Sequence, residues 1–151
     1  MGFLNDGVAG KDLTVNEENP SETVGALFTG SDGVYQYVKS EGGCSAGHFL
    51  LVDENGDATK LTTTNSGSLA QAVGVAVAAL TDEYYGWVWR GCGTFEAIVA
   101  DGVTAGNLTT TATDGVAGTG GDTIIGARNV DTGVTATRVT IFAATLMATN
   151  S

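Results

Sequence analysis

The 151-residue sequence predicts an all-β fold, a small β-sandwich or barrel-like domain with an extended N-terminal arm. Turn-forming residues recur roughly every 8–15 positions, as in sandwiches and barrels. Between the turns, apolar residues alternate with a period of two rather than with the period of a helix. A pattern of strand, turn, strand and glycine-broken strand also occurs twice, at about 34–80 and 94–146. The pattern leaves open whether these two modules close one barrel or form two small sheets.

Residues 1–22 differ from the β-domain that follows at 23–151. They are mostly polar or turn-forming, and their apolar residues show no strong period; these are Phe3, Leu4, Val8, Leu13 and Val15. Alone, such a segment would be disordered. We expect either a frayed terminus or an arm that becomes ordered against a neighbouring subunit.

The first module predicts strands at 24–29, 34–39, 47–52 and 58–64. Asn55-Gly56 lies between the last two and predicts a hairpin, because this pair readily supplies the positive φ angles of a tight turn. Residues 69–80 are ambiguous, since alanine favours helix. However, Val73, Val75 and Val77 alternate with small residues that include Gly74, which favours a buried strand approached closely by another backbone.

The aromatic centre of the chain lies at 84–91 and predicts a strand. Its candidate partner-binding residues are Tyr84, Tyr85, Trp87, Trp89 and Arg90. In an extended chain the two tryptophans share one face. They could pack on the core, contact another subunit as typical interface anchors, or stack against a ligand. The second module then predicts strands at 94–100, 105–111, 123–130 and 137–147.

Charge narrows the possible partners. The net charge is −11, with only six lysines and arginines. This argues against binding nucleic acid, which requires a basic surface, and against binding an anionic membrane. It fits a partner with a basic surface, or simply a soluble exterior whose like charges repel one another. No stretch approaches the ~18 apolar residues of a membrane-spanning helix.

No catalytic or metal-binding pattern stands out. His48 is the single histidine and follows Gly47 in a predicted strand, without a nucleophile motif around it. Cys44 and Cys92 are the only cysteines, and they could be free thiols or form one disulfide. The turn at 53–57 does not match the spacing of a calcium-binding EF-hand loop. We therefore expect no enzyme activity and no cofactor or metal.

Taken together, several motifs of small residues resemble the β-rich decoration, or cement, proteins of tailed-bacteriophage capsids. The resemblance covers roughly residues 34–142. The motifs are YVK at 37–39, SAG at 45–47, the turn at 53–58, AVGVA at 72–76, GWVWRG at 86–91 and TAGNL at 104–108. The longer, threonine-rich second half departs from the tightest form of this pattern.

This resemblance implies a structural virion protein on the capsid exterior, made in the host cytoplasm. It would bind the major capsid protein across capsomer joints, stabilise the expanded head and form a homotrimer. The N-terminal arm and the aromatic strand would be its contact surfaces. An alternative is a head-fibre or tail-associated adhesin, or another carbohydrate-binding β-module. A self-assembling tail-tube protein is a further structural alternative.

Overall fold

The computed structural model describes residues 11–62, 64–65, 71–91, 93–100, 106–110, 115–118, 123–129 and 137–148. Among these residues there are eleven strands and no helix, so the predicted all-β class is confirmed. In chain order the strands are β1 (Leu27–Gly30), β2 (Gly33–Ser40), β3 (Phe49–Val52), β4 (Asp57–Lys60), β5 (Gln71–Ala76), β6 (Tyr85–Trp89), β7 (Gly93–Val99), β8 (Gly106–Thr110), β9 (Ala117–Gly118), β10 (Thr123–Asn129) and β11 (Thr137–Ala148).

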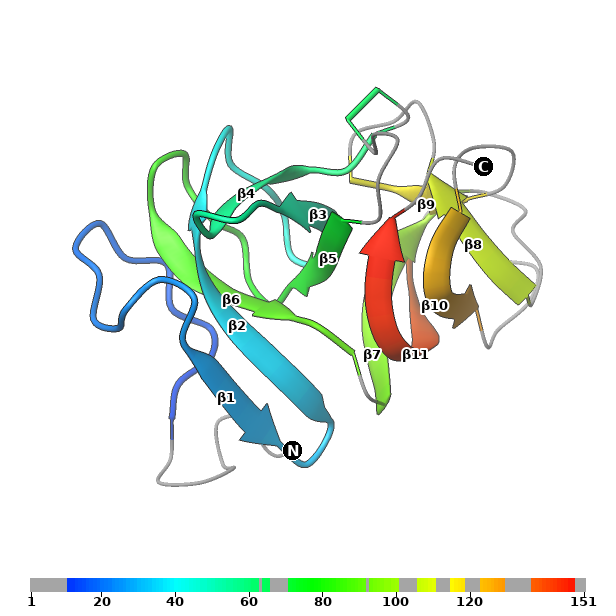
Figure 1. Cartoon of the computed structure of the whole chain (residues 1–151), viewed down its shortest axis with the longest axis horizontal. Helices are drawn as coiled ribbons and strands as arrows, with labels where there is room; N and C mark the ends of the chain where they lie inside the picture. Colours follow the sequence, from blue (N-terminus) through cyan, green and yellow to red (C-terminus); the bar gives the residue numbers. More distant parts are fainter. Residues whose placement is uncertain are drawn as a thin grey trace.

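Strands β2 to β6 close a five-stranded barrel. β2 pairs with β4 in parallel and with β6 antiparallel. The pairs β4–β3, β3–β5 and β5–β6, all antiparallel, complete the ring. Closure gives every strand two neighbours. β1 lies outside the ring and extends it by pairing antiparallel with β2 (Figure 1).

Strands β7 to β11 repeat the same pairing scheme. β7 pairs with β9 in parallel and with β11 antiparallel, and β9–β8, β8–β10 and β10–β11 close the second ring. The parallel contacts correspond closely: Lys39 lies opposite Asp57 in the first ring, and Val99 lies opposite Ala117, both sixty positions later, in the second. The repeated unit in the structure is therefore a complete small barrel.

The two barrels lie side by side and are joined through their backbones (Figure 1). The end of β11 pairs with β5, with Met147 opposite Ala72. The amide of Ile98 donates to the carbonyl of Gly47 at 2.9 Å, and the amide of Phe49 donates to the carbonyl of Gly115 at 2.8 Å. These contacts make one continuous β-body from the two rings.

The interior of the first barrel is filled by small and aliphatic side chains. Its cluster draws on all five strands of the ring and consists of Val38, Leu50, Val52, Ala58, Ala76, Leu80 and Val88. Gly74 faces this interior: a Cβ placed there would lie 2.7 Å from Cγ2 of Val88 and 3.3 Å from the carbonyl oxygen of Trp89. The close approach predicted at this glycine is therefore present, and the approaching strand is β6.

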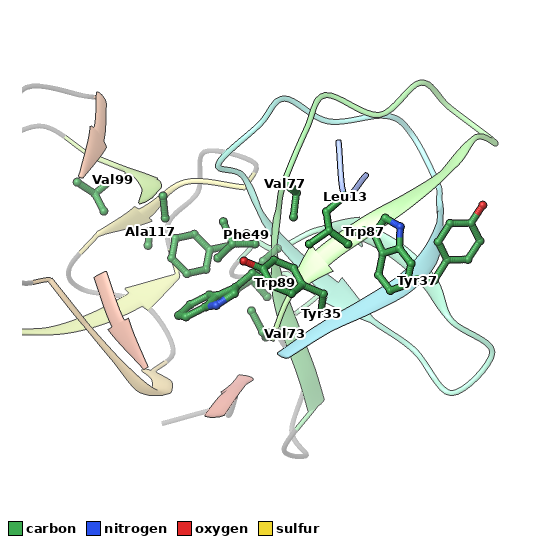
Figure 2. Packing of buried hydrophobic residues seen from close by; sticks show 13 residues of the cluster. Leu13, Tyr35, Tyr37, Phe49, Val73, Val77, Trp87, Trp89, Val99 and Ala117 are labelled. Atoms are coloured by element: carbon green, nitrogen blue, oxygen red, sulfur yellow. The ribbon is translucent and has the colours of Figure 1, made fainter. Parts of the chain in front are cut away.

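A second, aromatic cluster covers the outside of the first barrel. Residues of opposite parity on β2, β5 and β6 project into it, because neighbouring side chains on a strand point to opposite faces. The second barrel contributes Ala97, Val99 and Ala117, and the N-terminal segment contributes Leu13 (Figure 2). This cluster is the hydrophobic contact between the two barrels.

Several predicted elements differ in detail. The strand predicted at 24–29 is β1 at Leu27–Gly30, and the strand predicted at 58–64 is β4, which ends at Lys60. The hairpin at Asn55-Gly56 joins β3 to β4 as predicted, but among the described residues of this turn only Gly56 has a positive φ, at 85°. Asp53 closes the turn instead, accepting hydrogen bonds through Oδ1 from the amides of Asn55 and Asp57 at 2.8 and 2.9 Å. The strand predicted at 69–80 is shorter, since β5 ends at Ala76 and the chain then bends.

Candidate partner-binding site

The ten residues predicted to bind a partner fall into three groups in the structure. Phe3, Leu4 and Val8 lie outside the described residues. Leu13, Trp87 and Trp89 are buried within the chain. The remaining four are partly exposed: Val15, Tyr84, Tyr85 and Arg90. The structure brings the described part of the predicted arm and the aromatic strand β6 together.

Residues 11–22 are docked on their own barrel. Glu17 and Tyr85 form an antiparallel bridge, in which each amide donates to the other carbonyl at 3.0 and 2.8 Å. The side-chain amide of Asn16 donates to the hydroxyl of Thr81, and its carbonyl oxygen accepts from the Thr81 amide at 3.0 Å. Leu13 is 0% exposed. This part of the predicted arm is therefore anchored on its own chain.

The two tryptophans have the core role, the first of the alternatives raised by the sequence. Trp89 is 0% exposed, stacks on Phe95 with ring centres 5.2 Å apart, and donates from Nε1 to the carbonyl of Asp32 at 2.9 Å. Trp87 is 3% exposed and meets Tyr37 edge-on at 5.2 Å (Figure 2). The covering side chains come from distant parts of the chain.

Arg90 follows the aromatic strand and is half-buried. Its Nη1 donates to Oε1 of Gln36, while Nε is buried and has no hydrogen-bond partner among the described residues. Burial lowers the pKa of this guanidinium from its ordinary value. An unsatisfied buried donor of this kind is costly.

A pocket of about 210 Å³ opens where residues 11–22 cross β6. It is lined by Lys11, Asp12, Val15, Ser21, Glu22 and Trp87. The ammonium of Lys11 lies 5.6 Å from the centre of a Trp87 ring and forms an ion pair with Glu22. The pocket therefore combines an aromatic surface with carboxylates.

Sequence reasoning found Val15 and Trp87 of this pocket but missed Lys11, Asp12, Ser21 and Glu22. In the sequence, these four look like ordinary polar residues of a turn-rich terminus. Only the path of the chain brings them next to an aromatic residue more than sixty positions away. Leu27 was also missed: it is 68% exposed on β1, and alternation alone does not tell which face of an outer strand is covered.

A network around Glu17 holds the docked segment in place. Its carboxylate accepts hydrogen bonds from the hydroxyls of Ser21 and Tyr37 and from the Ser21 amide. Burial acts to raise the pKa of Glu17, but the hydrogen bonds from Ser21 and Tyr37 outweigh it, so the pKa is lowered. The pKa of Tyr37 is raised, first by burial and then by its bond to Glu17.

Acid is therefore expected to loosen residues 11–22. Because the folded-state pKa of Glu17 lies below its ordinary value of 4.5, its contribution is complete above that pH and is lost as the pH falls through the folded value. Solvent access limits the effect to about 0.5–1 kcal/mol. Hydrogen exchange of the Glu17 and Tyr85 amides should accelerate as the pH falls below about 4.5, beyond the intrinsic change.

Two variants test the assignment to Glu17. Glu17→Gln should lose most of this pH dependence, whereas Glu18→Gln, at the exposed neighbouring position, should retain it. Equal pH dependence of the bridge amides in wild type and Glu17→Gln would contradict the role of this carboxylate.

The single histidine and the described cysteine, which the sequence raised as candidate chemical groups, lie in ordinary structural environments. Nδ1 of His48 accepts a hydrogen bond from the Ser45 amide at 3.2 Å. Cys44 carries a free, half-buried thiol whose pKa is raised by burial, and Cys92 lies outside the described residues. Within the described ranges, no three His, Cys, Asp or Glu residues are grouped to hold a metal ion. The same ranges contain no helix able to cross a membrane.

Comparison with known proteins gives no match to a protein family, to a curated protein or to a solved structure.

Proposed function

We propose that this protein is a structural virion protein of a tailed phage. It would bind the outside of the capsid across capsomer joints, contact the major capsid protein and stabilise the expanded head. The structural observation that supports this best is the duplicated closed barrel. Two closed rings, joined by backbone pairing and by a shared hydrophobic cluster, form a body of the kind that can brace two neighbouring subunits of a shell.

The charge distribution supports a basic docking surface on the partner. The chain carries 17 acidic and six basic residues. Among the described basic residues, Lys11 and Lys39 are paired with Glu22 and Glu83. Like charges would repel an acidic partner, whereas a positive patch would be attracted and correctly oriented.

The outer strand β1 offers a second kind of contact. It pairs with β2 on one side, and no other described residue pairs with it. Leu27 on this strand is the large hydrophobic residue that the described part of the chain leaves exposed. A strand edge with an adjacent apolar side chain suits the addition of an extended segment from a neighbour.

Binding to heads tests the proposal. Purified protein is expected to sediment with expanded heads that lack it, to saturate, and to be released as the salt concentration rises because the contact is partly electrostatic. Unexpanded heads serve as the control and should bind less. Absence of saturable binding to expanded heads would contradict the proposal.

A homotrimer is part of this proposal, since the resemblance points to local three-fold positions. Light scattering across a dilution series should give three times the monomer mass of 15.2 kDa. A monomeric mass at all concentrations would contradict a homotrimer in solution. The protein could then assemble only on the capsid shell. The alternative of a carbohydrate-binding module has no specific support among the described residues, because Trp89 is buried in the core and Lys11 lies over the ring of Trp87.

A further inference from the structure

We propose that the pocket over Trp87 is a recognition site for a lysine or arginine side chain of a partner protein. In the structure its aromatic surface is occupied by the chain's own Lys11. The inference deepens the proposed docking function, on which the identity of the partner rests. The preference of the pocket for cations can be measured without any partner.

The side chains that line the pocket suit a positively charged group. A cation over an indole ring is attracted by the electron-rich face of the ring, and the attraction grows as water is excluded. Here the ammonium of Lys11 lies 5.6 Å from a ring centre of Trp87. The carboxylate of Glu22 pairs with the same ammonium, and Asp12 lines the pocket beside it. An aromatic face flanked by carboxylates is a site for a positively charged group.

The indole ring of Trp87 is held rigidly by its neighbours. Trp87 is held edge-on by Tyr37 at 5.2 Å and by Phe28 at 6.3 Å, and only 3% of its surface is exposed. The ring is therefore preorganised and loses little freedom on binding. Lys11, in contrast, keeps 31% of its side chain exposed and sits on a flexible stem. It can move aside while the indole stays in place.

The volume of the pocket limits what can bind in it. The pocket measures about 210 Å³, below the ~300–1,000 Å³ of typical small-molecule sites. It suits the end of one long side chain better than a cofactor or an oligosaccharide. The strong acidic excess of the chain also favours a basic partner residue as the occupant.

The test follows the two indole N–H resonances of the intact chain by NMR. The probe is N-acetyl-lysine methylamide, and the neutral control is the norleucine analogue. The Trp87 resonance is expected to shift with a Kd of roughly 10 mM. Trp89 is the internal control, because its Nε1 is bonded to Asp32 within the core. No selective shift of Trp87, or an equal shift with norleucine, would overturn the proposal.

Two variants that leave the buried core intact sharpen the result. Lys11→Met removes the resident charge but keeps the stem, so the probe should bind about two- to fivefold more tightly. Glu22→Gln should weaken binding by a similar factor. Weaker binding by Lys11→Met, or unchanged binding by Glu22→Gln, would contradict the assignment.

Probe binding and binding to heads, measured on the same protein, separate this inference from the proposed function. If the protein binds the probe at Trp87 but does not bind expanded heads, the cation-binding pocket is supported and the head is rejected as the partner. Binding to heads with no probe response at Trp87 would reject the pocket and retain the head.

Discussion

Replacing Trp89 with alanine is expected to destabilise the protein by about 3–5 kcal/mol, the usual cost of deleting a fully buried large aromatic side chain. Trp89 is 0% exposed, and its ring stacks on Phe95 of the second barrel. The change also leaves the carbonyl of Asp32 without its indole donor. Denaturant unfolding followed by circular dichroism measures the effect, which is a large part of a typical stability of ~5–15 kcal/mol.

Trp89→Phe is the matched control. It keeps an aromatic ring against Phe95 but loses the hydrogen bond to Asp32, so a smaller loss is expected, about 1–3 kcal/mol. A loss below about 1 kcal/mol for Trp89→Ala would show that the side chain is not buried between the barrels as described.

Truncating Leu13 to alanine is expected to cost about 2–5 kcal/mol, because Leu13 is completely buried against the aromatic cluster. The cost would appear first as undocking of residues 11–22, since these are held by few other buried apolar contacts. Limited proteolysis should therefore cut the variant within this segment before the barrels unfold.

Thr14→Ala is the control for this second variant. Thr14 is exposed, and its hydroxyl donates to Asp12 at 2.7 Å, so its loss should cost well under 1 kcal/mol. Equal protease sensitivity of Leu13→Ala and wild type would contradict the docking of this segment on the barrel.

Local sequence pattern predicted the strands well. Period-two alternation at 34–39 and 94–100 places β2 and β7 to within about a residue, because half-buried strands require that alternation. The hairpin after β3 was predictable because Gly56 tolerates a conformation that other residues avoid. These features depend only on near neighbours in the chain.

Long-range pairing was not predictable in the same way. The parallel contact of Lys39 with Asp57 and the pairing of Ala72 with Met147 have no local signature, so neither ring closure nor barrel number could be derived. The pocket over Trp87 is a further example. Nothing near Lys11 or Glu22 in the sequence indicates that Trp87 will lie beside them.

We propose that this duplicated barrel stabilises an expanded capsid. The most direct measurement is the temperature at which expanded, DNA-filled heads rupture, compared between heads that lack the protein and the same heads after its addition. A ligand that binds only the intact shell must raise that temperature by mass action. A rise that saturates with bound protein is the predicted result, and identical rupture temperatures with the sites filled would contradict the account.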